Sequence, residues 1–133
     1  MSDQIYHTLD AAPQKVAPFS HATEIDGWVF VTGQMPTWPD DPEKPLPKGI
    51  EAQTRRVMDN LIIVLDAIGL TLENALQVRV YITEFERDYA AMNATYQTYF
   101  QPEKLPARTC IGVTGLAVGA LVEIDLIARR PSE

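Results

Sequence analysis

The pattern of apolar and polar positions predicts two helices. Between Gly49 and Leu70, apolar residues recur every three or four positions with charged residues between them, and Gly69 stands where a helix commonly ends. Further along, large apolar side chains recur at steps of four, three, four and four residues; they are Phe85, Tyr89, Met92, Tyr96 and Phe100. We interpret both stripes as faces that pack against a core rather than as recognition surfaces.

Five segments show the patterns of β-strands: residues 18–25, 28–32, 76–83, 106–113 and 121–128. The alternation is clearest over 76–83, where Leu, Val and Ile alternate with mostly polar residues and predict one buried face. Residues 28–32 are almost entirely apolar, which predicts a buried strand. Asp26-Gly27 lies between the first two segments and is a strong turn signal, so we expect these segments to form a hairpin.

Two stretches are expected to lie outside the regular elements. Residues 35–48 contain five prolines and several acidic residues, which predicts a surface loop. Residues 1–16 show no clear period and predict an irregular arm. The remaining order is strand, strand, helix, strand, helix, strand, strand. It predicts an α+β fold in which a single mixed sheet is covered on one face by two helices, and the length of 133 residues fits one domain over 1–133.

Composition and charge narrow the possible functions. The net charge of −7 argues against a protein that grips a phosphate backbone. A single cysteine rules out an internal disulfide, and the two histidines fall in loop-like or edge-like segments, so we expect no metal site and recognise no cofactor motif. No apolar run approaches the ~20 residues needed to cross a bilayer. The N-terminus lacks the basic and apolar stretches of a signal peptide, so we expect a cytoplasmic protein.

Candidate chemistry lies in the last two predicted strands. Strict alternation puts Ile111 and Val113 on the expected core face of the first strand. Arg108 and Cys110 then point the other way, together with Glu123 of the second strand. An arginine can bind a small carboxylate through two hydrogen bonds, and a half-buried glutamate can activate water. The same spacing fits an ordinary cross-strand ion pair on a solvated face equally well.

Two helices cover only one face of such a sheet. The other face would carry a mixture of polar and apolar residues, namely Gln77, Arg79, Tyr81, Arg108, Cys110, Leu121, Glu123, Asp125 and Ile127. This mixture is too polar for a core and more apolar than a typical solvent face, as in a wet subunit interface. We therefore expect the chain to form an oligomer, whose stoichiometry the pattern leaves open.

Five short motifs occur in combination. They are Pro106-Ala107-Arg108-Thr109-Cys110, Val122-Glu123-Ile124, Val31-Thr32-Gly33-Gln34-Met35-Pro36, Met58-Asp59-Asn60-Leu61 and Met92-Asn93-Ala94-Thr95-Tyr96. Together they resemble the signature of the RidA family, also called YjgF/YER057c/UK114, over about residues 18–129. The resemblance implies a chorismate-mutase-like fold and a homotrimer with three clefts between adjacent subunits. It also implies cofactor-free hydrolysis of enamines and imines, such as 2-aminoacrylate and 2-iminopropanoate, to a 2-keto acid and ammonia.

The resemblance also assigns roles to single residues. Arg108 is expected to clamp the substrate carboxylate. Glu123 is expected to orient or activate the attacking water and to pass its proton to the leaving ammonia. Backbone groups around Gly33 and Cys110 are expected to hold the imine nitrogen, while Asn93 organises the cleft through hydrogen bonds.

Three further positions complete the expected cleft. Gln34 follows Gly33 with an amide that can hydrogen-bond the substrate, and Thr32 keeps the hydroxyl of the serine that is commoner at its position. Phe19 stands where many deaminating members carry a tyrosine, so a hydroxyl is lost there. That loss is compatible with slower turnover, a larger or more apolar imine, or another reaction. Cys110 is expected to line the cleft rather than attack, since neither histidine is placed to act as its base.

Three classes of function stay open. The first is deamination, of the imines named above or of another such as 2-aminomuconate. The second is a non-catalytic trimer that binds small carboxylates or keto acids through Arg108 and regulates a partner. The third is an RNA-directed activity, against which the acidic balance and the lack of an aromatic, basic platform weigh. Loss of activity with preserved carboxylate binding in Glu123→Ala would favour the first class over the second.

Overall fold

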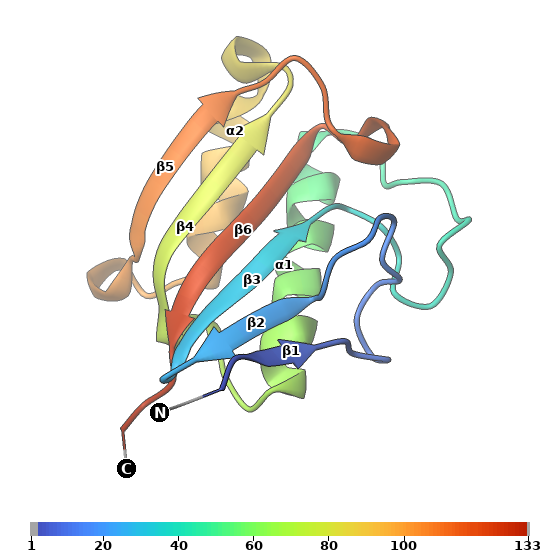
Figure 1. Ribbon diagram of the computed structural model, residues 1–133. Coiled ribbons are helices and arrows are strands. Elements are labelled where there is room, and N and C mark those ends of the chain that lie inside the picture. Colours follow the sequence, from blue (N-terminus) through green and yellow to red (C-terminus); the bar gives the residue numbers. More distant parts are fainter. Residues whose placement is uncertain (1–2, 133) are drawn as a thin grey trace.

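The computed structural model describes residues 3–132. They form one six-stranded sheet with the strand order β1-β2-β3-β6-β4-β5, and both helices pack on the same face of it (Figure 1). The strands are β1 (Ile5–His7), β2 (Ala22–Ile25), β3 (Trp28–Gln34), β4 (Ala75–Ile82), β5 (Ala107–Gly112) and β6 (Val122–Arg129), and the helices are α1 (Ile50–Ala67) and α2 (Phe85–Tyr96). Short 3-10 helices cover Leu72–Asn74, Gln97–Tyr99, Pro102–Lys104 and Ala117–Gly119. β4 and β5 are parallel and the other neighbouring pairs are antiparallel, which confirms the predicted mixed sheet.

The core lies between the sheet and the two helices. Burial alternates along β6, as the period of a half-covered strand requires. The residues that meet at the centre of the core are Val122, Ile124, Leu126 and Ala128 of β6 and Val57, Leu61, Val64 and Leu65 of α1. Among residues 3–132, neither helix is long and apolar enough to cross a membrane.

The N-terminal half of the sheet contains one element that the sequence pattern did not indicate. The predicted hairpin turn is confirmed, since Asp26 and Gly27 join β2 to β3 with φ angles of 52° and 82°, the left-handed pair that a two-residue hairpin needs. β1 lies within the stretch expected to be irregular. It forms by pairing with β2, and His7 Nε2 lies 3.1 Å from the carboxylate of Glu24.

Expectations about four single positions are wrong. Leu76 is 47% exposed rather than buried, because the register between β4 and β6 shifts at the start of β4 and changes the phase of the strand. Trp28 and Phe30 of β3 are exposed on the face of the sheet away from the helices. Phe100 lies outside α2, because the chain tightens into a 3-10 turn after Tyr96.

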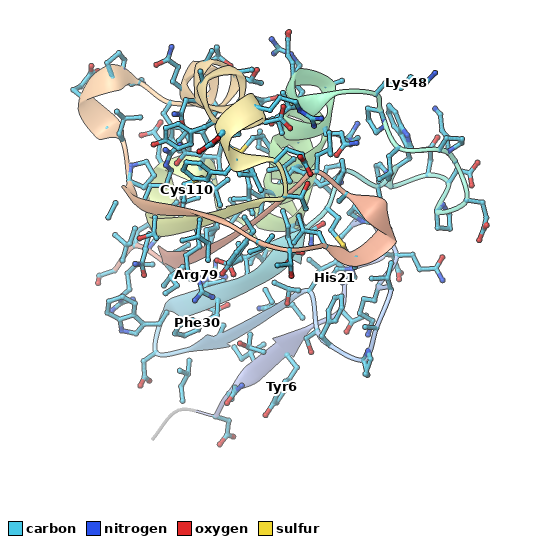
Figure 2. The ribbon with its side chains drawn as sticks, turned by 90° about the horizontal axis from the view of Figure 1, so that it is seen from above. Tyr6, His21, Phe30, Lys48, Arg79 and Cys110 are labelled. Carbon is cyan, nitrogen blue, oxygen red and sulfur yellow. The ribbon has the colours of Figure 1, made fainter. Side chains whose placement is uncertain are left out.

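The faces of β5 are the reverse of the expected ones. β5 pairs in parallel with β4, so that Arg108 lies beside Val78 and Cys110 beside Val80, and both valines point into the core. Cys110 therefore packs on the helix side of the sheet (Figure 2). Ile111 is exposed on the other side. Because β5 is an edge strand, its covered face depends on where α2 packs rather than on its own aliphatic residues.

Polar side chains tie both ends of the chain to the sheet. Arg130, just past β6, donates hydrogen bonds of 2.8 and 2.9 Å to the carboxylate of Glu24, which also contacts His7. The hydrogen bonds from Arg130, aided by His7 and opposed by burial, lower the pKa of Glu24 to about 2. The buried His21 accepts the Leu9 N–H through Nδ1 at 2.9 Å and therefore donates through Nε2 to a carbonyl of the N-terminal arm at 2.8 Å.

Candidate functional site

Arg108 lies in a cleft between β5 and α2. The helix runs antiparallel to the strand: Phe85 at its start packs on Gly112, and Tyr96 at its end packs under Arg108. The guanidinium carbon is 5.0 Å from the centroid of the Tyr96 ring and 6.0 Å from that of Tyr89. These cation–π contacts orient the guanidinium plane. Arg108 forms no ion pair within residues 3–132, so its donors can bind an anionic ligand.

The cleft beside Arg108 has a volume of about 340 Å³. Its lining residues are Asn93, Tyr96, Gln97, Leu105, Pro106 and Arg108. Asn93 Oδ1 and the Tyr96 hydroxyl are buried, and neither has a hydrogen-bond partner in the described part of the chain. Buried polar atoms of this kind mark places where a ligand or water can bind. Burial raises the pKa of Tyr96 to about 12 against the opposing charge of Arg108, so the phenol is protonated at neutral pH.

Cys110 is two residues from Arg108 on the same face of β5 and is half-buried. Burial raises the pKa of its thiol, and the positive charge of Arg108 opposes this shift. Both histidines of the chain are engaged elsewhere, His7 with Glu24 and His21 with the N-terminal arm. A neutral thiol with no base beside it is a weak nucleophile, which agrees with the interpretation of Cys110 as a lining residue. Residues 3–132 contain no group of three or more side chains that could hold a metal ion.

Glu123 lies on the opposite face of the sheet, paired with Tyr81 of β4. The backbone of Gly33 passes directly over its carboxylate, so that a Cβ at this position would overlap Glu123 Oε2. Burial raises the pKa of Glu123, and the charge of Asp125 raises it further. Asp125 is itself held by Arg79 at 2.8 and 2.9 Å and by the Tyr81 hydroxyl at 3.1 Å. Both effects favour the protonated form, so the carboxyl of Glu123 holds a proton more readily than a solvated glutamate does.

The end of β3 lies beside Glu123 through Gly33 and brings further predicted site residues close to Gly33. A register shift between Val31 and Gln34 breaks the pairing with β6 and leaves Gly33 out of the ladder. Thr32 Oγ1 donates a 2.6 Å hydrogen bond to the Ser20 carbonyl, which fixes the segment that carries Phe19. Phe19 and Gly33 line one small pocket.

Gln34, the last residue of β3, is more deeply buried than Gly33. It pairs with Ile124, whose side chain faces the helices, and Gln34 is buried on that side. Gln34 also lines the small pocket that Phe19 and Gly33 line, so its position is compatible with the predicted contact to a ligand.

The predicted site residues thus form two groups. The Arg108 group comprises Asn93, Arg108 and Cys110 on the helix side, and the Glu123 group comprises Phe19, Thr32, Gly33, Gln34 and Glu123 around the end of β3. β4 separates β5 from β6, so Arg108 and Glu123 are two strands apart, roughly 10 Å across the sheet, and on opposite faces. The expectation that Arg108, Cys110 and Glu123 share one face is wrong within a single chain.

Comparison with known proteins identifies the family. A family model described as Endoribonuclease L-PSP matches residues 9–130. The chain belongs to this family, the RidA family. A RutC family protein of Pyrococcus abyssi is 35% identical over 131 residues, which are 98% of this chain and 99% of the relative. An Escherichia coli relative, 30% identical over 121 residues that cover 90% of this chain and 92% of the relative, is named 2-iminobutanoate/2-iminopropanoate deaminase.

Solved structures agree with the RidA-family fold. The crystal structure of RidA from the Antarctic bacterium Psychrobacter sp. matches with a TM-score of 0.86 at 28% identity, over 94% of this chain and 98% of that one. A yeast protein, YEO7, matches with a TM-score of 0.90 at 28% identity, over 97% of this chain and 100% of that one. The predicted sheet with two helices on one face is therefore the fold of this family.

Tyr89 and Tyr96 are two neighbours of Arg108 in this RidA-family chain that the sequence analysis did not assign to the candidate site. Both belong to the stripe interpreted as core packing, and both contact Arg108. The contact between α2 and β5 could have been anticipated from the residue spacings of a helix and a strand. Residues two positions apart on a strand are about 7 Å apart, and residues four positions apart on a helix are about 6 Å apart. A helix lying antiparallel along the edge strand therefore places its start beside the end of β5, as for Phe85 and Gly112, and its end beside the start of β5, as for Tyr96 and Arg108.

Proposed function

We propose that this RidA-family chain hydrolyses small reactive enamines and imines, of the 2-aminoacrylate and 2-iminopropanoate type, to 2-keto acids and ammonia. The observation that carries the proposal is the Arg108 guanidinium, which lies over an aromatic ring in a cleft and has no carboxylate partner among residues 3–132. Such a group suits two-point binding of a substrate carboxylate. The E. coli relative named as a deaminase supports the same reaction class.

The proposed reaction needs a held carboxylate, an oriented water and a proton relay. Arg108 binds the carboxylate and thereby positions C2 of the iminium next to a water held by Glu123. The water oxygen adds to C2 while Glu123 accepts a proton, which gives a carbinolamine. Glu123 returns this proton to the nitrogen, the C–N bond breaks, ammonia leaves, and the hydroxyl loses its proton to form the ketone. An enamine first takes a proton at C3. The raised pKa of Glu123 suits a group that both accepts and returns a proton.

The separation of the two groups supports a site shared between subunits. We propose a homotrimer in which the Arg108 group of one subunit faces the Glu123 group of the next. The face of the sheet away from the helices is partly apolar and exposes Trp28, Phe30 and Ile111. Figure 2 shows Phe30 and Arg79 on this side, opposite Cys110. Such a surface suits contact with another copy of the chain.

Mixing two inactive variants tests the shared site. Arg108→Ala and Glu123→Gln are each expected to be inactive alone. If trimers of the two variants are dissociated and reassembled together in equal amounts, about a quarter of the clefts combine an intact Arg108 from one subunit with an intact Glu123 from the next. Activity of the mixture should recover to roughly that fraction of wild type. A mixture that stays inactive, although mass measurement shows mixed trimers, would contradict the shared site.

The deaminase activity itself is tested with imines generated in situ. A dehydratase would supply 2-aminoacrylate and an amino-acid oxidase would supply 2-iminopropanoate, and semicarbazide would trap the imine that survives. Wild type should accelerate imine loss, and Arg108→Ala should lower kcat/KM by about 100-fold or more, because positioning is lost. Absence of acceleration with several imines of different size would overturn the proposal.

A non-catalytic carboxylate-binding trimer remains the second candidate. It is favoured by the same Arg108 cleft, since binding alone needs no Glu123. Glu123→Gln separates the two functions: a deaminase loses turnover and retains keto-acid binding, whereas a binding protein loses nothing. An RNA-directed activity has no comparable support, because the chain carries a net charge of −7.

A further inference from the structure

Tyr89 stands apart from the other aromatic residues of α2. Its hydroxyl lies 3.5 Å from Arg108 Nη2. A guanidinium nitrogen can only donate, so the Tyr89 oxygen is the acceptor in this contact and its own O–H proton is directed elsewhere. Tyr89 is 36% exposed. Its hydroxyl proton is therefore available to a ligand that binds at Arg108.

The position of this hydroxyl is held by the surrounding rings. Tyr89 stacks on Phe85, with ring centroids 4.7 Å apart and planes inclined by 20°. Phe85 in turn packs against Gly112 of β5, where a Cβ would lie only 3.1 Å from the phenylalanine Cβ. The strand thus fixes Phe85, Phe85 fixes the Tyr89 ring, and the ring sets the hydroxyl beside the guanidinium. A donor fixed in this way loses little conformational freedom on binding.

The two tyrosines contact Arg108 in different ways: Tyr96 through its ring, and Tyr89 also through its hydroxyl. Tyr96 is 5% exposed and its ring lies 5.0 Å from the guanidinium carbon, so it supports the arginine from below. Tyr89 is more distant, with its ring centroid at 6.0 Å, and it meets the arginine through its hydroxyl. Phe19 in the Glu123 group brings a ring without a hydroxyl. The Tyr96 hydroxyl is buried in the lining of the cleft, whereas Tyr89 is the phenol whose hydroxyl contacts the guanidinium itself.

We propose that Arg108 and Tyr89 together form the carboxylate-binding site, with guanidinium N–H groups and the Tyr89 O–H donating to the same carboxylate. This rests on the proposed function in that the carboxylate belongs to a 2-imino acid or to its 2-keto acid product. The phenol adds a directional donor to a planar cation, so the site distinguishes a carboxylate from an amide or ester of the same size. An amide nitrogen or an ester alkyl group would leave one of these donors unmatched.

Tyr89→Phe tests the proposal, because it removes the O–H and keeps the ring and its stacking on Phe85. The affinity for 2-oxobutanoate, measured by calorimetry, should fall by about 10-fold, the usual effect of losing a hydrogen bond to a charged group. In turnover of an in-situ imine, KM should rise by a similar factor while kcat changes little, because the bond is present in ground and transition states alike. 2-Oxobutanamide should bind weakly to wild type and to the variant equally.

Tyr99→Phe is the matched control. Tyr99 donates to Asp59 at 3.0 Å, away from both site groups, so removal of its hydroxyl should leave 2-oxobutanoate affinity unchanged. Phe19→Tyr combined with Tyr89→Phe asks whether a hydroxyl from the other group can substitute, and the proposal expects no recovery of affinity.

The outcomes also separate this proposal from the proposed function. Equal 2-oxobutanoate affinity in wild type and Tyr89→Phe would overturn the role of Tyr89, even if imine hydrolysis and its dependence on Arg108 are observed. Loss of affinity in Tyr89→Phe without any imine hydrolysis by wild type would support the joint carboxylate site and refute the deaminase.

Discussion

The chemistry of Glu123 comes from its neighbours rather than from its position in a motif. Gly33 excludes water from one side of the carboxylate, and the charge of Asp125 adds to the effect of burial. Both influences favour the protonated form. Arg108, in contrast, lies against two aromatic rings, which stabilise its positive charge through cation–π contacts without neutralising it. The surroundings of Glu123 come from β3 and from β6 itself, and those of Arg108 come from α2.

Glu123→Gln should stabilise the protein while it abolishes turnover. The pKa of Glu123 is raised in the folded state, so its ionised form destabilises the fold at neutral pH and the neutral glutamine does not. We expect a higher Tm than wild type at pH 7 and a kcat lower by about 100-fold or more. The stability difference should shrink as the pH falls through the folded-state pKa and vanish below the unfolded value of about 4.3. Thermal melts from pH 4 to 8 measure it; a lower Tm for the variant at pH 7 would contradict the role of burial.

Gly33→Ala should damage the Glu123 group directly. A methyl group here would overlap Glu123 Oε2, so the carboxylate must turn away from its present position. We expect kcat to fall by about 10-fold or more, because displacement of a catalytic group by about 1 Å is costly. Gly115→Ala is the control, since a Cβ there meets nothing within 4 Å. Equal kcat values for the two variants would show that the close approach at Gly33 has no catalytic importance.

At the scale of elements, the outer strands depend on the contacts between the two ends of the chain. β1 and β2 are joined to the segment after β6 by Glu24, which binds Arg130 and His7. Arg130 also donates to the Ile68 carbonyl just past α1 at 2.9 Å. One arginine therefore links a strand, the C-terminal segment and the end of a helix.

Glu24→Gln should loosen these elements. The folded-state pKa of Glu24 is about 2, below the unfolded value of about 4.3, so its ionised form contributes on the order of 2 to 3 kcal/mol at neutral pH. This contribution should be lost as the pH falls from about 4.3 towards 2, where wild type and variant converge. Urea unfolding at pH 7 and pH 3 measures the difference. Glu73→Gln removes the exposed pair with Lys104 and should change little; an equal effect of both changes would contradict the argument.

At the scale of the whole molecule, two features point to association. The Arg108 and Glu123 groups lie on opposite faces of the sheet, and the face away from the helices exposes aromatic residues. If another copy of the chain covers the exposed aromatic face, the Arg108 group of one subunit can lie next to the Glu123 group of another. Oligomerisation would then complete the site as well as bury apolar surface.

Phe30→Asp tests this assembly. Phe30 is 46% exposed and opposite Ile127 on the face away from the helices. An aspartate there should leave the single chain folded and introduce a charge into the subunit contact. We expect light scattering to show a trimer for wild type and a monomer for the variant, with activity lost together with assembly. Ile62→Asp on α1, where Ile62 is 39% exposed, should remain trimeric. A trimeric Phe30→Asp protein would exclude this face as the interface.

The elements and the fold class follow from patterns that are local in sequence. α1 is recognisable from the three-to-four-residue period of its apolar side chains, and Asp26-Gly27 from the backbone angles that a tight hairpin demands. Such signals depend on residues within a few positions of one another. The motifs around Arg108 and Glu123 likewise mark the candidate residues without any knowledge of their surroundings.

The faces of the edge strands depend on contacts between residues far apart in sequence. Nothing within residues 107–112 decides that Arg108 points toward α2 and Ile111 away from it; the parallel register with β4 and the packing of α2 decide it. β1 forms for the same kind of reason, through pairing with β2. Alternation along a strand specifies which side chains share a face. Which of the two faces is buried depends on where the other elements of the fold, such as α2, pack against the strand. The separation of Arg108 from Glu123 is therefore a property of the folded chain.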